Sequence, residues 1–262
     1  MKLSDLGSDL EYDIIKLIKQ IIVDRQFDTS SNTGDLTWIQ GTPVPVDDAS
    51  GNRGSDAIDL QLWTDQNTEV AGGDYSGILC GGENTIESQG DGAAILGGFN
   101  NYIGDGSAGG DFSLAAGTGA IAISDHQFAF GSYYSVYGDA QASWHTQSST
   151  MAITDSWNDL FSFDVPTDTT WTFLALITGI RQGATESFSY KVEGCIENDG
   201  GTVSLLASTV TTIYEDDASY ALQAVADDSS NELEFQLQDT DNSGASSRWH
   251  CALHVSEIAW AA

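Results

Sequence analysis

Apolar and polar residues alternate along most of the C-terminal part of the chain. The alternating runs start at Leu160, Trp171, Phe188, Val203, Tyr220, Leu233 and Trp249. A period of two is typical of strands that turn one face toward a core, and clusters of Asp, Gly, Ser and Asn separate the runs. Seven such runs without a helical pattern predict an antiparallel, jelly-roll-like β-sandwich over residues 156–262. The Ser- and Thr-rich stretch 147–155 before it is predicted to be a linker.

An aspartate followed by a short apolar run and a glycine recurs over residues 73–146. A unit of 14 to 20 residues is too short to bury its own apolar face, so the units are expected to stack as a β-roll, a solenoid of short strands. The glycines supply turns and the aspartates cap them through bonds to the backbone. The repeat residues are Asp74, Asp91, Gly97, Asp111, Gly117, Asp125 and Gly131.

Many apolar positions in these repeats are alanine, which makes the expected solenoid narrow. A narrow solenoid suits the packing of three chains around one axis, and we therefore expect a homotrimer. Two alternatives stay open. One is a glycine-rich β-sandwich with coincidental periodicity, and the other is a Ca²⁺-binding repeat, although the nonapeptide pattern of such repeats is not met.

Residues 1–27 carry the helix signals of the chain. Ser8 and Glu11 form a capping box at the start of the helix. The apolar positions that follow at helical spacing are Leu10, Ile14, Leu17, Ile18, Ile21 and Ile22. This helix either packs on its own domain, or bundles with two copies or enters a socket on a larger assembly, which would make it an anchor. Residues 28–72 lack helix signals and are predicted to be a β collar or linker.

The charge balance restricts the possible partners. The chain has 8 Lys and Arg against 39 Asp and Glu, a net charge of -31. Phosphates would be repelled, which argues against nucleic acid and against anionic lipid. The acids are spread over the whole sequence, as in proteins of salt-loving hosts or in ordinary acidic secreted or marine proteins. The apolar stretch 14–23 is too short and too charged for a membrane span, so no membrane insertion is expected.

No pattern typical of a catalytic or metal site occurs in the chain. Gly-x-Ser-x-Gly, His-Glu-x-x-His, the P-loop and the dinucleotide motif are all missing from the sequence. His250 and His254 would lie about 13 Å apart along a strand, too far for a shared metal. The three cysteines have no ligand-like spacing and are expected to be free buried thiols of a protein made in a reducing cytoplasm. We therefore expect no enzyme, no metal and no cofactor.

The repeats Asp-x-x-Φ-Ala-Φ-Gly, where Φ is apolar, resemble the β-roll heads of trimeric autotransporter adhesins, which recur in bacteriophage fibres. The C-terminal run from Val165 to Phe173 and the closing run from Arg248 to Val255 resemble the β-sandwich knobs of phage fibre and appendage proteins. Phe128, Phe130 and Trp144 depart from the β-roll pattern, where smaller residues are usual. The resemblance implies a homotrimeric virion surface protein, either a head fibre, a decoration protein or a tail fibre.

Such a protein would bind other virion proteins through its N-terminus and a host-surface glycan or protein through its knob. It would be made in the host cytoplasm and carried on the virion surface. Exposed aromatic and acidic turn residues are the candidates for receptor contact: Tyr214, Asp216, Asp217, Asp239 and Asp241. Two alternatives remain, a cellular trimeric adhesin or surface-layer protein, and a polysaccharide-degrading enzyme similar to a tailspike.

Overall fold

The computed structural model describes residues 54, 57–61, 69–104, 109–132, 140–183, 186–241 and 244–259, together with the backbone of two short paired strands, β1 (Phe27–Asp28) and β2 (Thr37–Trp38). The predicted N-terminal helix and most of the predicted collar lie outside these residues. All the regular structure described is β, which confirms the mainly β class. Within the described ranges, no helix is of a length and hydropathy to cross a membrane.

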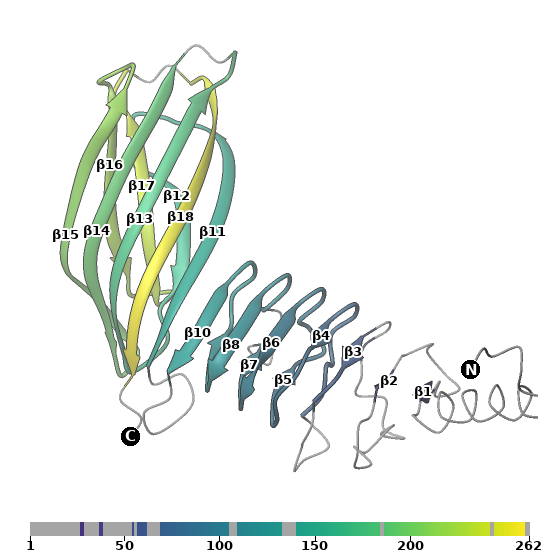
Figure 1. The fold of residues 1–262 in the computed structure, drawn as a ribbon. Helices are drawn as coiled ribbons and strands as arrows, with labels where there is room; N and C mark the ends of the chain where they lie inside the picture. The colour runs from purple at the N-terminus through teal and green to yellow at the C-terminus, as the bar shows by residue number, and fades with distance from the viewer. Residues whose placement is uncertain are drawn as a thin grey trace, which may run out of the picture.

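The strands from β3 to β10 form a β-solenoid, as the repeats predicted (Figure 1). One parallel sheet contains β3 (Ile58–Asp59), β4 (Gly77–Ile78), β6 (Ala94–Phe99), β8 (Leu114–Thr118) and β10 (Phe128–Ser132). The second parallel sheet contains β5 (Thr85–Ile86), β7 (Tyr102–Ile103) and β9 (Ile121–Ala122). The repeats of Asp74, Asp91 and Asp111 each add one strand to both sheets, while β3 and β10 extend only the first, so the coil grows by lateral stacking.

The core of the solenoid is a thin column of small and branched residues. Ile78, Ile95, Ala115 and Ala129 lie opposite one another on successive strands, and each is fully buried. The narrowing from isoleucine to alanine fits a coil whose two sheets approach closely. Burial of this column is what makes neighbouring repeats depend on one another.

Glycines sit where adjacent turns of the coil touch. Gly98 has a φ of 113°, a conformation that L side chains rarely adopt. A Cβ atom at Gly98 would lie 1.8 Å from the carbonyl oxygen of Gly117 in the next turn. Glycine is therefore required there both by the backbone conformation and by the contact.

The strands from β11 to β18 form two antiparallel sheets around one core, here called the two-layer region. Their bounds are β11 (Ala140–Ala152), β12 (Asn158–Asp164), β13 (Thr169–Arg181), β14 (Ser187–Asp199), β15 (Thr202–Glu215), β16 (Tyr220–Asp227), β17 (Glu232–Asp239) and β18 (Ser246–Ala259). Strands β15, β14, β13, β18 and β11 form the larger layer in that order, and β12, β17 and β16 form the smaller one. Large buried side chains fill the space between the layers, including Trp171, Phe188, Tyr190 and Phe235.

The two regions share one continuous sheet. Phe128 of β10 pairs in parallel with Leu114 of β8 and in antiparallel fashion with Trp144 of β11. The ten strands from β15 to β3 are therefore one hydrogen-bonded sheet that passes from the two-layer region into the solenoid (Figure 1).

The prediction of a linker at residues 147–155 is wrong for most of that stretch. β11 continues to Ala152, and its residues from Gln147 onward pair with β18 from Cys251 to Ser246. The hydroxyl side chains misled the prediction because Ser and Thr are as common in turns as on the wet face of a strand. The backbone of β11 is fixed by its ladder with β18, whatever its side chains favour. The predicted end of the stalk at residue 146 also falls inside this strand.

Candidate functional site

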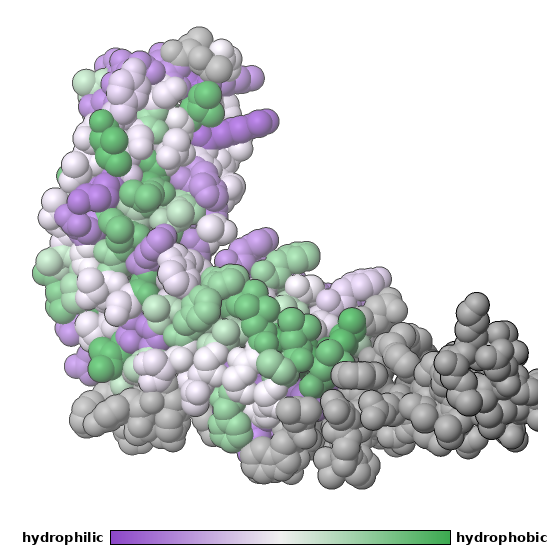
Figure 2. Space-filling view, in the orientation of Figure 1, coloured by the Kyte–Doolittle hydropathy of each residue, from purple (hydrophilic) through white to green (hydrophobic). Residues whose placement is uncertain are grey.

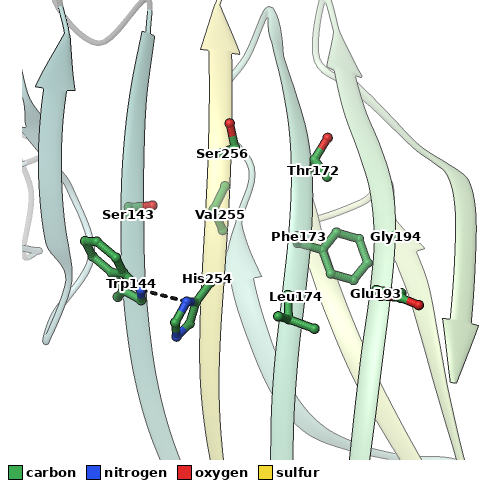
Figure 3. Close-up of a pocket in the computed structure, with 10 residues that line it drawn as sticks. All are labelled: Ser143, Trp144, Thr172, Phe173, Leu174, Glu193, Gly194, His254, Val255 and Ser256. Atoms are coloured by element: carbon green, nitrogen blue, oxygen red, sulfur yellow. Dashed lines mark hydrogen bonds between the residues drawn. The ribbon is translucent and has the colours of Figure 1, made fainter. Parts of the chain in front are cut away.

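A shallow groove of about 540 Å³ lies on the outer face of the larger layer, close to its junction with the solenoid (Figure 3). Four of its side chains stand in one row across four strands, because the register places Trp144 opposite His254, His254 opposite Leu174, and Leu174 opposite Glu193. The row brings together residues that are far apart in the sequence, and only the antiparallel pairing of β11, β18, β13 and β14 aligns them.

Trp144 is held in place from two sides. Its indole Nε1–H donates a hydrogen bond of 2.7 Å to Nδ1 of His254. Because Nδ1 accepts this bond, the neutral imidazole carries its proton on Nε2, which leaves that N–H free to donate to another group. On the solenoid side, the rings of Phe128 and Phe130 lie edge-on to the indole at 6.2 and 5.5 Å between centroids.

The far side of the groove is polar. Nζ of Lys191 lies 3.2 Å from both carboxylate oxygens of Glu193, and both side chains are partly exposed. The groove therefore combines an aromatic surface, an imidazole N–H and a carboxylate. Such a set can hold a sugar ring by stacking and hydrogen bonding.

This groove was not predicted from the sequence, in which Phe128, Phe130 and Trp144 stand out only as departures from the small residues usual in a β-roll. Their common signal was position: each lies at an outward-facing place on one of two adjacent strands, and each is 37–38% exposed. His254 and Glu193 could not be found from sequence, because nothing local relates them to Trp144.

The predicted receptor-contact residues lie together at the end of the two-layer region that is farther from the solenoid (Figure 1). The hydroxyl of Tyr214 donates to Oδ1 of Asp216 at 2.6 Å, and the backbone N–H of Ser187 donates to Oδ2 at 2.7 Å. These two bonds lower the pKa of Asp216 and the first raises the pKa of Tyr214. Asp217 accepts a bond from the backbone N–H of Ser219.

Asp239 does not fit the prediction of an exposed contact residue. It is only 1% exposed, and its Oδ1 accepts bonds from the Ser219 hydroxyl at 2.9 Å and from the backbone N–H of Asp241 at 3.1 Å. The sequence pattern could not separate a turn-capping aspartate from an exposed one. Asp241 itself is exposed.

The aspartates of the repeats form a ladder along the solenoid. Oδ1 of Asp91 accepts a bond from the backbone N–H of Asp74 at 2.7 Å, and Oδ1 of Asp111 accepts one from Asp91 at 2.9 Å. Asp125 continues the ladder by accepting from the N–H groups of Asp111 and Gly110. Each carboxylate thus joins its own turn of the coil to the preceding one.

A second ladder, of buried amides, was missed by sequence analysis. Oε1 of Gln61 accepts from the backbone N–H of Asn84, Oδ1 of Asn84 accepts from that of Asn101, and Oδ1 of Asn101 accepts from that of Ala120. Asn84 and Asn101 are 0% and 1% exposed. Since these amides form their hydrogen bonds inside the coil, they stabilise the fold and do not bind a ligand. The recurrence of asparagine at Asn84 and Asn101, at equivalent positions of successive repeats, is the sequence feature that could have predicted this ladder.

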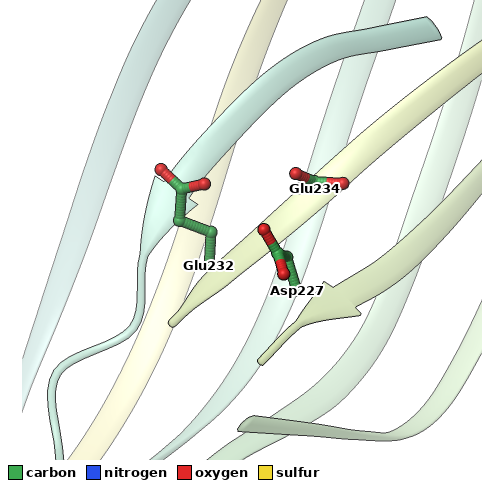
Figure 4. A group of neighbouring side chains, drawn as sticks. All are labelled: Asp227, Glu232 and Glu234. Atoms are coloured by element: carbon green, nitrogen blue, oxygen red, sulfur yellow. The ribbon is translucent and has the colours of Figure 1, made fainter. Parts of the chain in front are cut away.

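Three carboxylates gather where β16 meets β17 (Figure 4). Oxygen atoms of Asp227, Glu232 and Glu234 all lie within 4.8 Å of one another, a geometry that a divalent cation could use. The pKa of Glu234 is raised by partial burial and by neighbouring acids such as Asp159, while hydroxyl and backbone bonds from Ser230 and Ser229 lower that of Asp227. Those bonds already account for the arrangement, so the cluster does not define a metal site.

Glu257 and His145 are ionisable groups buried in the inner face of the large sheet. Burial raises the pKa of Glu257 to about 7, although Gln141 donates a bond of 3.2 Å to its Oε2, and burial lowers the pKa of His145 to about 4. The Ser143 hydroxyl lies 3.0 Å from Nε2 of His145, but both residues are at most 3% exposed and out of a substrate's reach. The three cysteines are free, but only Cys251 is buried as expected, since Cys195 is partly exposed and Cys80 is exposed.

No protein-family model matches the chain, and no curated protein matches it either. Among solved structures, it is similar to a tailspike protein of Acinetobacter baumannii bacteriophage Fri1, a capsular polysaccharide depolymerase, at 10% identity and a TM-score of 0.30, over 85% of this chain and 52% of that one. It is also similar to the tailspike protein of Acinetobacter baumannii phage AM24, at 9% identity and a TM-score of 0.31, over 79% and 50%.

The chain therefore spans about half the length of the structures it matches. At TM-scores this low, the likeness by itself assigns no function to this chain. It does overturn one expectation. The sequence patterns predicted a protein that is not an enzyme, whereas the first of these structures is of a depolymerase. That prediction is contradicted and is withdrawn. Its weak point was to judge catalysis from missing local motifs, although catalytic groups can be assembled from distant strands.

Proposed function

We propose that this chain is a virion surface protein, part of a phage tail appendage that attaches the particle to its host. In this proposal the solenoid is a stem, residues 1–27 join the stem to other virion proteins, and the two-layer region faces the host. The chain acts as a homotrimer and contacts a surface glycan through the two-layer region.

The observation that supports this proposal best is the continuous sheet between stem and outer part. Strands β13, β14, β15 and β18 are each 13 or 14 residues long, which corresponds to about 45 Å. The loops that contain Asp217 and Asp241 are thus held far from the solenoid by the hydrogen-bonded backbone of the described strands. A rigid extended body with its loops at one end is suited to attachment at a distance.

The net charge of the protein restricts the classes of ligand that it can bind. At a net charge of -31, the protein would repel an anionic polymer at long range unless salt screens it. A neutral saccharide is the ligand class that this surface favours.

Binding of the labelled full-length protein to an array of bacterial surface polysaccharides tests the proposal. We expect binding to neutral members, and at least a tenfold loss in the combined variant Tyr214→Ala, Asp217→Asn, Asp241→Asn. The matched control is Asp199→Asn, an exposed acid at the opposite end of the strands. A folded protein that binds no polysaccharide and no bacterial cell would overturn the proposal. Release of reducing ends on the same array would decide for the polysaccharide-degrading alternative.

A further inference from the structure

We infer that copies of this chain associate through the outer face of the ten-stranded sheet, from β3 in the solenoid to β13 in the two-layer region. The inference deepens the proposed function, because it assigns a surface to the self-association on which that proposal rests. It is supported by the distribution of apolar side chains, by the distribution of charge and by the size of the surface.

Exposed apolar side chains gather on this face. Nine of the sixteen large hydrophobic residues that are exposed in the described part of the chain lie there, at exposed fractions from 37% to 61%. They include Leu79 and Leu96 on the solenoid, Phe130 and Trp144 at the junction, and Leu176 on β13. Figure 2 shows the solenoid part of this face as a continuous hydrophobic patch over β4, β6, β8 and β10. Monomeric proteins rarely expose an apolar surface of this extent.

Carboxylates avoid the same face. The chain has 39 Asp and Glu in 262 residues, yet no outward-facing residue of the eight neighbouring strands β3, β4, β6, β8, β10, β11, β18 and β13 is one of them. Asp59 and Glu257, which lie on these strands, point inward and are 7% exposed. The first outward acid in this direction is Glu193 on β14.

This distribution favours a second copy of the chain as the occupant. Two copies with a net charge of -31 each repel each other wherever acidic surfaces meet, and they repel least where both surfaces lack carboxylates. The face also extends over both regions in one sheet. A partner that covers it along its whole length must be equally long, and another copy of this chain has that length.

The size of the surface is sufficient for a stable interface. Large apolar side chains have about 200 Å² each, so nine of them at these exposed fractions present on the order of 800 Å². A stable interface of standard size buries about 800 Å² on each partner. In addition, most of the groove beside Trp144 lies within the same face, since only Glu193 and Gly194 of its lining belong to β14, so a second copy that covers the face also covers most of the groove.

Light scattering of the purified full-length protein at micromolar concentration tests the inference. We expect a mass near three times 27.8 kDa. The variants Phe130→Glu and Leu96→Glu should each weaken association at least 100-fold and yield monomers. Leu176→Glu gives the same readout in the two-layer region, in case a change in the solenoid prevents folding. Circular dichroism verifies the fold of each variant.

The matched control is Phe112→Glu. Phe112 is 66% exposed and belongs to the same solenoid, but it lies on a turn, where it stacks on His126, and not on the sheet face. This variant should keep the mass of the unchanged protein.

A monomeric unchanged protein would overturn the inference, as would folded Phe130→Glu and Leu176→Glu variants of unchanged mass. The latter result would leave the trimer and the attachment function standing, with the N-terminal segment as the site of association. A monomer that binds saccharide in the groove at Trp144 would give the face a different occupant and overturn the inference.

Discussion

The solenoid and the two-layer region share one sheet but are stabilised in different ways. In the solenoid, parallel strands stack small residues such as Ala115 and Ala129, and buried amides such as Asn101 join one turn to the next. In the two-layer region, antiparallel strands enclose a core of large aromatic side chains such as Trp171 and Phe235. A coil two sheets thick has little room for apolar volume, so side-chain hydrogen bonds supply part of its cohesion. The same backbone ladder can therefore be supported by two kinds of interior.

Truncation of the aromatic core should have the largest effect. Phe235 is fully buried, with its ring 6.1 Å from that of Phe163 and 6.0 Å from that of Phe173. Phe235→Ala leaves a cavity between the layers, and we expect it to lower the free energy of unfolding by about 3–5 kcal/mol. Denaturant unfolding followed by tryptophan fluorescence measures the loss. A cost below that of Ala115→Gly in the solenoid would contradict the assigned difference between the two interiors.

The junction of the two regions should respond to pH through Glu257. Its pKa is about 7 in the folded protein because burial disfavours the carboxylate, against an ordinary value of 4.5. The folded state therefore binds the proton more tightly, and the group's contribution to stability falls as the pH rises from 4.5 to 7. Glu257→Gln abolishes this pH-dependent loss. We expect it to raise the free energy of unfolding by about 3 kcal/mol at pH 8, relative to the unchanged protein, and to have little effect at pH 4.

Melting of both proteins between pH 4 and 9 measures this difference. His145 acts in the opposite sense, since its lowered pKa costs stability as the pH falls from 6.5 to about 4. It contributes equally to both proteins and cancels in the comparison. Parallel melting curves at all pH values would refute the role assigned to Glu257.

Disruption of the amide ladder in the solenoid should have the next largest effect on stability. Asn101→Ala removes the acceptor for the N–H of Ala120 and the donor to the carbonyl of Gly117, and it leaves the N–H of Ala120 buried without this partner. We expect a loss of about 2 kcal/mol. Hydrogen exchange should show the loss as faster exchange in β7 and β9, with the two-layer strands β16 and β17 unchanged. Equal acceleration in both regions would argue that the solenoid does not open independently.

Disruption of the exposed aspartate ladder should have the smallest effect on stability. Asp91→Ala removes one acceptor, for the N–H of Asp74, at a site open to water. Water replaces the lost partner, so we expect a cost of about 1 kcal/mol. Asp91→Asn is the matched variant, because it keeps an acceptor oxygen and loses the charge, and it should cost less. A loss larger than that of Asn101→Ala would reverse the assigned importance of the two ladders.

The sequence was informative where local chemistry repeats. The recurring Asp and Gly of 73–131 predicted the solenoid, because a short unit with a turn at each end has few other ways to bury its apolar face. Alternation likewise predicted strands at Leu160, Trp171 and Phe188. It failed at 147–152, where Ser and Thr suggested a linker and the ladder with β18 makes a strand.

The candidate site was much less accessible to sequence reasoning. Trp144, His254 and Glu193 meet only because three antiparallel pairings bring their strands into register. Asp239 and Asp241 are alike in sequence, yet one is buried and bonded to Ser219 while the other is exposed. Neither the meeting of these three side chains nor the different burial of the two aspartates can be predicted from the few residues on either side of them in the sequence.

The local periods, the turn positions and the charge follow from the residue types and their spacing, so they could be predicted before the fold was known. That the two regions share one sheet, which face of that sheet lacks carboxylates, and which distant residues meet in the groove became evident only in the folded protein. Alternation along one strand indicates only whether a side chain points inward or outward. Only strand order and register say which outward residues become neighbours and so form one surface.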